Sequence, residues 1–314
     1  MSNRCDECKQ KIDMRKGATY SKGRHLCVPC DDRLRAEYMA APAEPVIKWV
    51  GGKRQLMDEI RKYVPASFGT YFEPFVGGAA VFFALRPQRA VLSDLNDNLI
   101  TMYRVVRDDM KNLGWQLTNG DYTSDEKNYY RIRARNMKGP DVQRAADFLY
   151  LNKFGFNGMY RENRNGEFNV PYGKNPDAEI DLDNLRRSSE ALQGVTLITE
   201  PFQAVLENAR EGDFVYFDPP YVPVSATSDF TGYQGEGFDA SAQIRLRDIA
   251  SVLHQRRVHV LLSNSAAPAV FDLYRDFRIA IVKARRSVNS DATKRGPVDE
   301  VLIRPPSRWE YAFA

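Results

Sequence analysis

The stretch that most constrains this chain is residues 213–221, with the sequence DFVYFDPPY. Its apolar and aromatic part, Phe214–Phe217, predicts a short buried strand. Proline has no N–H to donate to a sheet ladder and fixes its own φ, so the strand has to end in a stiff loop at the two prolines. That loop holds a carboxylate, a main-chain carbonyl and an aromatic face in one rigid group.

Such a group can activate an exocyclic amine on a flat heterocycle, whose lone pair is otherwise delocalised into the ring. The Asp218 carboxylate and the Pro219 carbonyl would accept its two hydrogens and favour a pyramidal nitrogen, while Pro220 stiffens the turn. Tyr221 would stack on the ring. Acceptors fixed in advance act mainly on the transition state, where charge develops on nitrogen. The alternative is a plain proline-rich turn; the strand before the motif and the tyrosine after it favour a site.

Composition places the chain among soluble proteins, with room for one large domain and a smaller module. It has 314 residues, of which 43% are hydrophobic and 27% charged. No apolar run approaches the length of a membrane span, and the polar N-terminus carries no signal-peptide core. These features predict a cytoplasmic protein with no membrane partner.

Charge is concentrated in two segments, although the net charge is only +4. Residues 1–40 carry 9 Lys and Arg against 6 Asp and Glu, and residues 127–175 carry 10 against 4. Two basic segments on an acidic body predict a polyanionic partner, most simply nucleic acid. Solvated helix faces are the alternative for either segment alone.

All the cysteines fall in one C-x2-C-x18-C-x2-C pattern, formed by Cys5, Cys8, Cys27 and Cys30. This spacing is typical of a four-thiolate zinc site, and a module with few large apolar side chains would depend on the metal for its folding energy. Disulfides are the alternative, which a cytosolic compartment disfavours. We predict a structural zinc ribbon over residues 1–39, a linker at 40–45 and the main domain at 46–314. The ribbon would contact phosphates or mediate a homodimer.

The main domain alternates predicted strands and helices, with glycine turns between them. Gly51-Gly52-Lys53 precedes a helix, and Gly77 follows the predicted strand Thr70–Glu73. Glycines let the backbone approach a ligand at the carboxyl end of a first strand. The next predicted strand, 90–93, ends at Asp94, where such folds bind ribose hydroxyls; a helix N-cap is the alternative. The full G-x-G-x-x-G fingerprint is absent, which counts against a dinucleotide.

Between about residues 110 and 190 the alternation lapses into helices and a polar segment where aromatics, Asn, Gly, Arg and Lys interleave. Asn165-Gly166 predicts a hairpin turn there. Such a mixture is typical of a nucleic-acid surface, with a polar Ω-loop as the alternative. Further along, Val222–Phe238 is predicted to be a mobile lid. Lys283–Arg295 is predicted to be a basic loop for phosphate contacts, with a plain solvated loop as the alternative.

Five motifs follow one another: IKWVGGK at 47–53, EPFVGG at 73–78, SDLN at 93–96, LNKFGFNG at 151–158 and DPPY at 218–221. Together they resemble the Dam-like, alpha-group (D12 class) DNA adenine-N6 methyltransferases, over about residues 45–305. The resemblance implies an α/β, Rossmann-like class I S-adenosylmethionine-dependent methyltransferase domain with a helical target-recognition insertion at about 110–190. The predicted zinc ribbon lies outside the resemblance.

The resemblance also implies roles for matching positions. Cofactor contacts would come from Trp49, Lys53, Phe75, Gly77, Asp94 and Asp218. The catalytic loop would be Asp218, Pro219, Pro220 and Tyr221. Phe156 would wedge into duplex DNA beside Asn157, Lys48 would read a flanking base, and the other base-contacting positions are Met159, Arg161 and Pro171. Lys174 stands where the family often has arginine.

The expected function is therefore site-specific methyl transfer from S-adenosylmethionine to N6 of an adenine flipped out of double-stranded DNA. Zinc would be structural, because the chemistry needs no metal. An RNA adenine or DNA cytosine-N4 methyltransferase is one alternative. A catalytically silent DNA-binding regulator is another.

Overall fold

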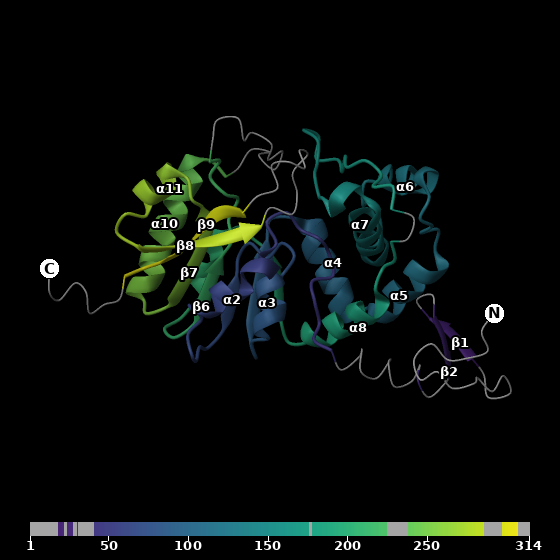
Figure 1. Cartoon of the computed structure of the whole chain (residues 1–314), viewed down its shortest axis with the longest axis horizontal. Coiled ribbons are helices and arrows are strands. Elements are labelled where there is room, and N and C mark those ends of the chain that lie inside the picture. The colour runs from purple at the N-terminus through teal and green to yellow at the C-terminus, as the bar shows by residue number, and fades with distance from the viewer. Residues whose placement is uncertain are drawn as a thin grey trace.

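A seven-stranded sheet lies at the centre of the computed structural model of this chain (Figure 1). Its strand order is β5-β4-β3-β6-β7-β9-β8. The first five strands in this order are parallel, whereas β9 pairs antiparallel with both β7 and β8. The strands are β3 (Tyr71–Glu73), β4 (Ala90–Asp94), β5 (Thr196–Thr199), β6 (Phe214–Phe217), β7 (His259–Ser265), β8 (Arg278–Arg285) and β9 (Pro297–Arg304).

The structure describes residues 18–21, 24–27, 30, 41–175, 178–224, 238–285 and 297–306. Most of the predicted lid (225–237) and of the predicted basic loop (286–295) therefore lies outside the described residues. Within the described part, no helix is long and apolar enough to cross a membrane.

Apolar side chains cover both faces of the sheet because neighbouring residues of a strand point to opposite sides. Tyr71 and Phe214 belong to one core, which the sheet forms with η1, α2–α8 and the residues that precede η1. Phe72 and Val215 belong to a second core, which the sheet forms with α9–α11. The helices are η1 (Lys53–Leu56), α2 (Met57–Arg61), α3 (Ala80–Leu85), α4 (Asp97–Asp108), α5 (Met110–Asn119), α6 (Glu126–Arg133), α7 (Asp141–Phe154), η2 (Phe156–Gly158), α8 (Leu182–Ala191), η3 (Phe202–Ala204), α9 (Val205–Asn208), α10 (Ala240–Gln255) and α11 (Pro268–Leu273).

The segment between β4 and β5 forms a helical lobe. Figure 1 shows α4–α8 on one side of the molecule, with α10 and α11 on the opposite side. After α7 the chain enters a hairpin in which Glu162 pairs with Phe168. Gly166 takes a left-handed φ of 72° and donates its N–H to the Asn163 carbonyl, which confirms the turn predicted at Asn165-Gly166.

Near the N-terminus, β1 (Ala18–Ser21) and β2 (Arg24–Cys27) pair as an antiparallel hairpin. This hairpin follows the first C-x2-C motif and ends at Cys27, the first cysteine of the second. Cys5, Cys8 and the side chain of Cys27 lie outside the described residues, and Cys30 is buried. The described side chains include no group of three or more His, Cys, Asp or Glu that could hold a metal ion. The zinc ribbon stays a prediction.

Candidate active site

Four polar side chains meet where the parallel strands end. Glu73 ends β3, Asp94 ends β4, Asp218 follows β6, and Ser263 lies near the end of β7. Carboxyl ends of parallel strands share one edge of a sheet, which is where open α/β sheets bind their ligands. The predicted loop at Asp218 and the predicted acid at Asp94 are thus on the same edge.

Asp218 is paired with Lys53. The Lys53 Nζ lies 2.8 Å from Asp218 Oδ1; the lysine side chain is 3% exposed and that of the aspartate 20%. The same ammonium donates to the Gly51 carbonyl and lies 4.8 Å from the centre of the Tyr221 ring. Lys53, expected from the resemblance as a cofactor contact, is therefore held directly against the DPPY loop.

A network from α10, β7 and β9 holds that loop, and sequence reasoning missed it. Gln243 donates to the Pro220 carbonyl at 2.9 Å, and the Asn264 side chain accepts from Val222 N–H at 3.1 Å. The Asn264 amide also donates to Gln243 Oε1 at 3.1 Å. The Tyr221 hydroxyl donates to Glu300 Oε2 at 2.8 Å, which fixes its ring. The available signal was a polar run, residues 263–265, at the end of an apolar strand.

Two acceptors of the loop stay open. Within the described part of the chain, no donor bonds Asp218 Oδ2 or the Pro219 carbonyl, whereas Asp218 Oδ1 is occupied. Both belong to a loop whose flanking groups are fixed by hydrogen bonds. The arrangement can therefore accept two hydrogens from one planar amine without moving first.

The glycine turn after β3 packs under Trp49. Gly77 has a φ of 44°, and a Cβ built on it would lie 2.6 Å from Trp49 Cδ1. Asp94 accepts from Gly77 N–H at 3.2 Å through Oδ2 and from Asn96 N–H at 3.0 Å through Oδ1. Burial raises the pKa of Asp94. Phe75 stacks on Phe202, with ring centres 5.3 Å apart.

Glu73 lies under this edge and is 3% exposed. Its Oε2 accepts from the Tyr71 hydroxyl at 2.9 Å and from Phe82 N–H at 3.2 Å. Burial raises the pKa of Glu73 to about 8; the Tyr71 hydrogen bond opposes the rise and the Asp218 charge adds to it. Folded Glu73 therefore keeps a proton that the unfolded chain releases near pH 4.5.

This proton makes a testable contribution to stability. Because the folded state binds it more tightly, the Glu73 contribution is full below pH 4.5 and is lost as pH rises towards about 8. Glu73→Gln keeps an acceptor for the Tyr71 hydroxyl and the Phe82 N–H. It should remove a slope of up to about 1.4 kcal/mol per pH unit from the free energy of unfolding plotted against pH. Urea unfolding of both proteins across this range gives the difference. Parallel stability curves would contradict the assignment.

The residues expected to contact DNA gather around the end of α7. Buried Asn152 accepts from Lys48 N–H at 2.9 Å and donates to the carbonyls of Lys48 and Gly158 at 2.8 and 2.9 Å. A Cβ on Gly158 would lie 2.6 Å from Lys48 Cδ, so the lysine stem rests on this glycine. Phe156 is 48% exposed, and Asn157 takes a left-handed φ of 57°. The structure thus brings Lys48 to the turn that carries Phe156 and Asn157.

The remaining positions follow on the hairpin. Arg161 is exposed and donates to the Asn169 side chain at 2.6 Å. The Pro171 carbonyl accepts from Phe156 N–H at 2.8 Å, and exposed Lys174 has a φ of 51°. Met159 is different, because it is half-buried against the core.

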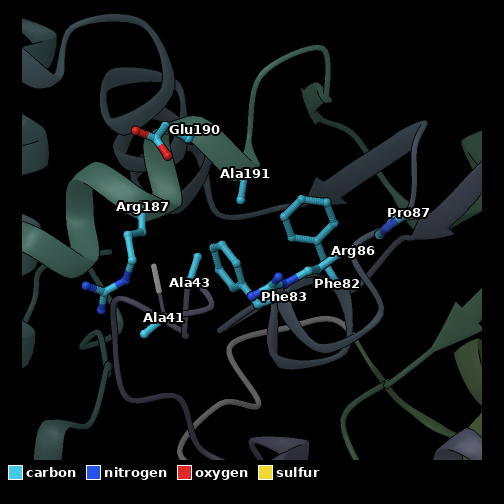
Figure 2. Close-up of a pocket in the computed structure, with 9 residues that line it drawn as sticks. All are labelled: Ala41, Ala43, Phe82, Phe83, Arg86, Pro87, Arg187, Glu190 and Ala191. Atoms are coloured by element: carbon cyan, nitrogen blue, oxygen red, sulfur yellow. The ribbon is translucent and has the colours of Figure 1, made fainter. Parts of the chain in front are cut away.

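The cavity in Figure 2, of about 380 Å³, is a separate feature. It lies between residues 41–43, α3 and α8, and none of the predicted site residues lines it. Phe83, Arg86, Arg187 and Glu190 are among its lining residues.

The strand order, with the single reversed strand β9 between β7 and β8 and acids at the ends of parallel strands, is consistent with a class I methyltransferase. Residues 49–288 match the D12 class N6 adenine-specific DNA methyltransferase family. The chain belongs to this family and is an adenine-specific DNA methyltransferase.

Relatives agree with this assignment. The chain is 40% identical over 268 residues to the Type II methyltransferase M1.LlaDCHI of Lactococcus lactis subsp. cremoris, covering 82% of this chain and 94% of that protein. It is 38% identical over 283 residues to the Type II methyltransferase M.MjaIII of Methanocaldococcus jannaschii, covering 83% and 98%. It is 35% identical over 260 residues to the DNA adenine methylase of Escherichia coli K12, covering 82% and 93%.

Proposed function

We propose that this enzyme takes an adenine out of duplex DNA and methylates its N6 while the DPPY loop holds the amine. One observation carries the proposal: Asp218 Oδ2 and the Pro219 carbonyl are open acceptors, within the described residues, on a loop held by Gln243 and Asn264. The site lies at the carboxyl edge of the sheet, which suits a planar base entering from outside.

The residues fit S-adenosylmethionine. Asp94 uses one lone pair on each oxygen for a backbone N–H, which leaves acceptor capacity for the hydroxyls of a ribose. Gly77 has no Cβ to fill the turn, and Phe75 and Trp49 supply flat apolar surface beside it. The cofactor would supply an electrophilic methyl group on a sulfonium. Lys53, at the start of η1 and held against the DPPY loop, would be a further cofactor contact.

The target adenine has to leave the base stack because its amine is unreachable inside a duplex, which costs on the order of a few kcal/mol. Asp218 and Pro219 would accept the two N6 hydrogens, and Tyr221 would stack on the base. These contacts offset the unstacking cost and favour the pyramidal nitrogen of the transition state. Lys53 stabilises the half-buried carboxylate by its charge.

The DNA would lie across the turn and hairpin after α7. Exposed Phe156 is suited to insertion between base pairs, with Asn157 beside it. Lys48 and Arg161 carry the donors that read guanine edges. Met159, Pro171 and Lys174 complete the proposed surface, which apart from Lys48 lies in a target-recognition insertion at about 110–190.

Nucleoside analysis tests this function. The enzyme is incubated with labelled cofactor and with DNA or RNA of mixed sequence, and the products are digested. N6-methyladenine in the DNA digest alone supports the proposal, and sequencing modified plasmid sites then gives the recognition sequence. Methylated cytosine, methylation of RNA alone, or cofactor binding without any product would each contradict it.

We also propose that Cys5, Cys8, Cys27 and Cys30 bind one structural zinc ion in a ribbon over residues 1–39, joined by a linker at 40–45 to the methyltransferase domain at 46–314. The β1–β2 hairpin, which ends at Cys27 of the second cysteine pair, supports this organisation. The ribbon would contact DNA phosphates or mediate a homodimer.

Cys5→Ser tests the metal site. Loss of one thiolate should reduce bound zinc from about one equivalent per chain towards zero, because structural zinc sites need all four ligands. Metal analysis of purified protein measures this, and sedimentation of the same samples reports whether a dimer is lost. Ser2→Ala is the control for a small change near the same end. Unchanged zinc content in Cys5→Ser would refute the site.

A further inference from the structure

A buried pair of hydroxyls lies beneath the Asp218 carboxylate. Tyr216 and Ser263 are both fully buried. Phe217 of β6 pairs with Leu262 of β7 in parallel register, so the residues that follow them, Asp218 and Ser263, are also neighbours. The Ser263 hydroxyl donates to Asp218 Oδ1 at 2.7 Å, and the Tyr216 hydroxyl donates to Ser263 Oγ at 3.0 Å.

The direction of these hydrogen bonds follows from the number of hydrogens. A serine hydroxyl has one hydrogen to donate. Its two acceptors are Asp218 Oδ1 at 2.7 Å and the Phe217 carbonyl at 3.4 Å, and the shorter contact to a carboxylate is the stronger. The Tyr216 hydroxyl must then donate to serine. Burial and the Asp218 charge raise the pKa of Tyr216 well above its ordinary value, so the phenol stays protonated.

The two oxygens of Asp218 are therefore unequal. Oδ1 receives Ser263 on one side and Lys53 on the other. Oδ2 has no hydrogen-bond partner within the described residues. Two donors on one oxygen fix the rotation of the carboxylate and leave the other oxygen available to accept a hydrogen bond.

We infer that Tyr216 and Ser263 are positioning residues for methyl transfer: they hold Asp218 through Oδ1, so that Oδ2 accepts the adenine N6–H. This inference rests on the proposed function. The inference gives the two Asp218 oxygens separate roles: Oδ1 orients the carboxylate, and Oδ2 accepts the hydrogen of the substrate amine. A pair of hydroxyls that only fills the core would affect stability and leave turnover of the folded enzyme unchanged.

Ser263→Ala gives the first test. It removes one donor to Oδ1, so kcat should fall about 10- to 100-fold, as for other groups that orient a charged residue. KM for DNA and the cofactor Kd should stay within about threefold, since no binding group changes. Ser263→Thr restores the hydroxyl and should recover most of kcat. Equal losses in Ser263→Ala and Ser263→Thr, or an effect on KM alone, would overturn the inference.

Tyr216→Phe tests the order of the hydrogen-bond relay that runs from Tyr216 through Ser263 to Asp218. Because Tyr216 acts through Ser263, its effect on kcat should disappear in the Ser263→Ala background. Additive effects would overturn the relay. Tyr274→Phe is the matched control, since Tyr274 is also fully buried and its hydroxyl has no partner within the described residues. It should change kcat little.

Asp218→Asn separates this inference from the proposed function. If Asp218→Asn is inactive while Ser263→Ala turns over at the wild-type rate, the relay is wrong and the function stands. If Asp218→Asn itself turns over normally, the role proposed for Asp218 fails.

Discussion

Replacing Asp218 by asparagine should lower kcat for DNA methylation by at least about 100-fold, because a preorganised charged acceptor at the reacting amine is lost. Binding of DNA should change little, since Phe156 and Arg161 lie on the separate turn and hairpin after α7 and Lys48 packs against that turn. Single-turnover methylation and a DNA-binding titration with the same oligonucleotides measure the two effects.

Asp218→Asn should also lower the stability of the protein. Lys53 is 3% exposed and would lose its anionic partner. Breaking a buried ion pair from one side costs about 3–5 kcal/mol of stability. Asp218→Asn combined with Lys53→Met removes the unpaired charge and should regain stability but not activity. Glu211→Gln is the control. It also replaces a carboxylate of an ion pair by an amide, but this pair, with Arg257, is exposed and lies outside the site, so neither stability nor activity should change. Near-normal turnover of a folded Asp218→Asn enzyme would refute the role of this carboxylate.

Strands that end in chemically distinctive residues could be predicted from the sequence. Phe214–Phe217 is a strand with the predicted bounds, because an apolar run followed by two prolines allows little else. The strand before Asp94 was also predicted and extends one residue further, to Asp94 itself. The two acids lie at the same edge of the sheet, on either side of β3, because parallel strands bring their carboxyl ends together.

Contacts made between distant segments could not be predicted. Gln243 and Asn264 are ordinary polar residues in the sequence, and only the packing of α10 on β7 places them around the DPPY loop. The ion pair between Lys53 and Asp218 depends in the same way on how η1 is placed against the loop after β6.

Helices α5 and α8 were not predicted individually from the sequence. Trp115 of α5 is exposed, which blurs the apolar periodicity that marks a helix.

Gly77→Ala should weaken binding of S-adenosylmethionine by about 10- to 100-fold, since displacement of a positioning group by about 1 Å has effects of this size. The new Cβ would lie 2.6 Å from Trp49 Cδ1 and 2.7 Å from its Nε1. The indole has little room to retreat, because it stacks against Tyr160 and Phe148 with ring centres 5.6 and 6.4 Å away. The turn would have to shift instead, and with it the N–H that Gly77 gives to Asp94.

Gly194→Ala separates this clash from backbone strain. Gly194 also has a left-handed φ, of 74°, but a Cβ there meets nothing within 4 Å. Both variants should lose about 1–2 kcal/mol of stability from the left-handed backbone, and only Gly77→Ala should lose cofactor affinity in calorimetric titration. If the two variants bound the cofactor equally well, the glycine turn would have no part in the cofactor site. The role of Asp94 would then have to be tested by itself, because its carboxylate is held by that same turn.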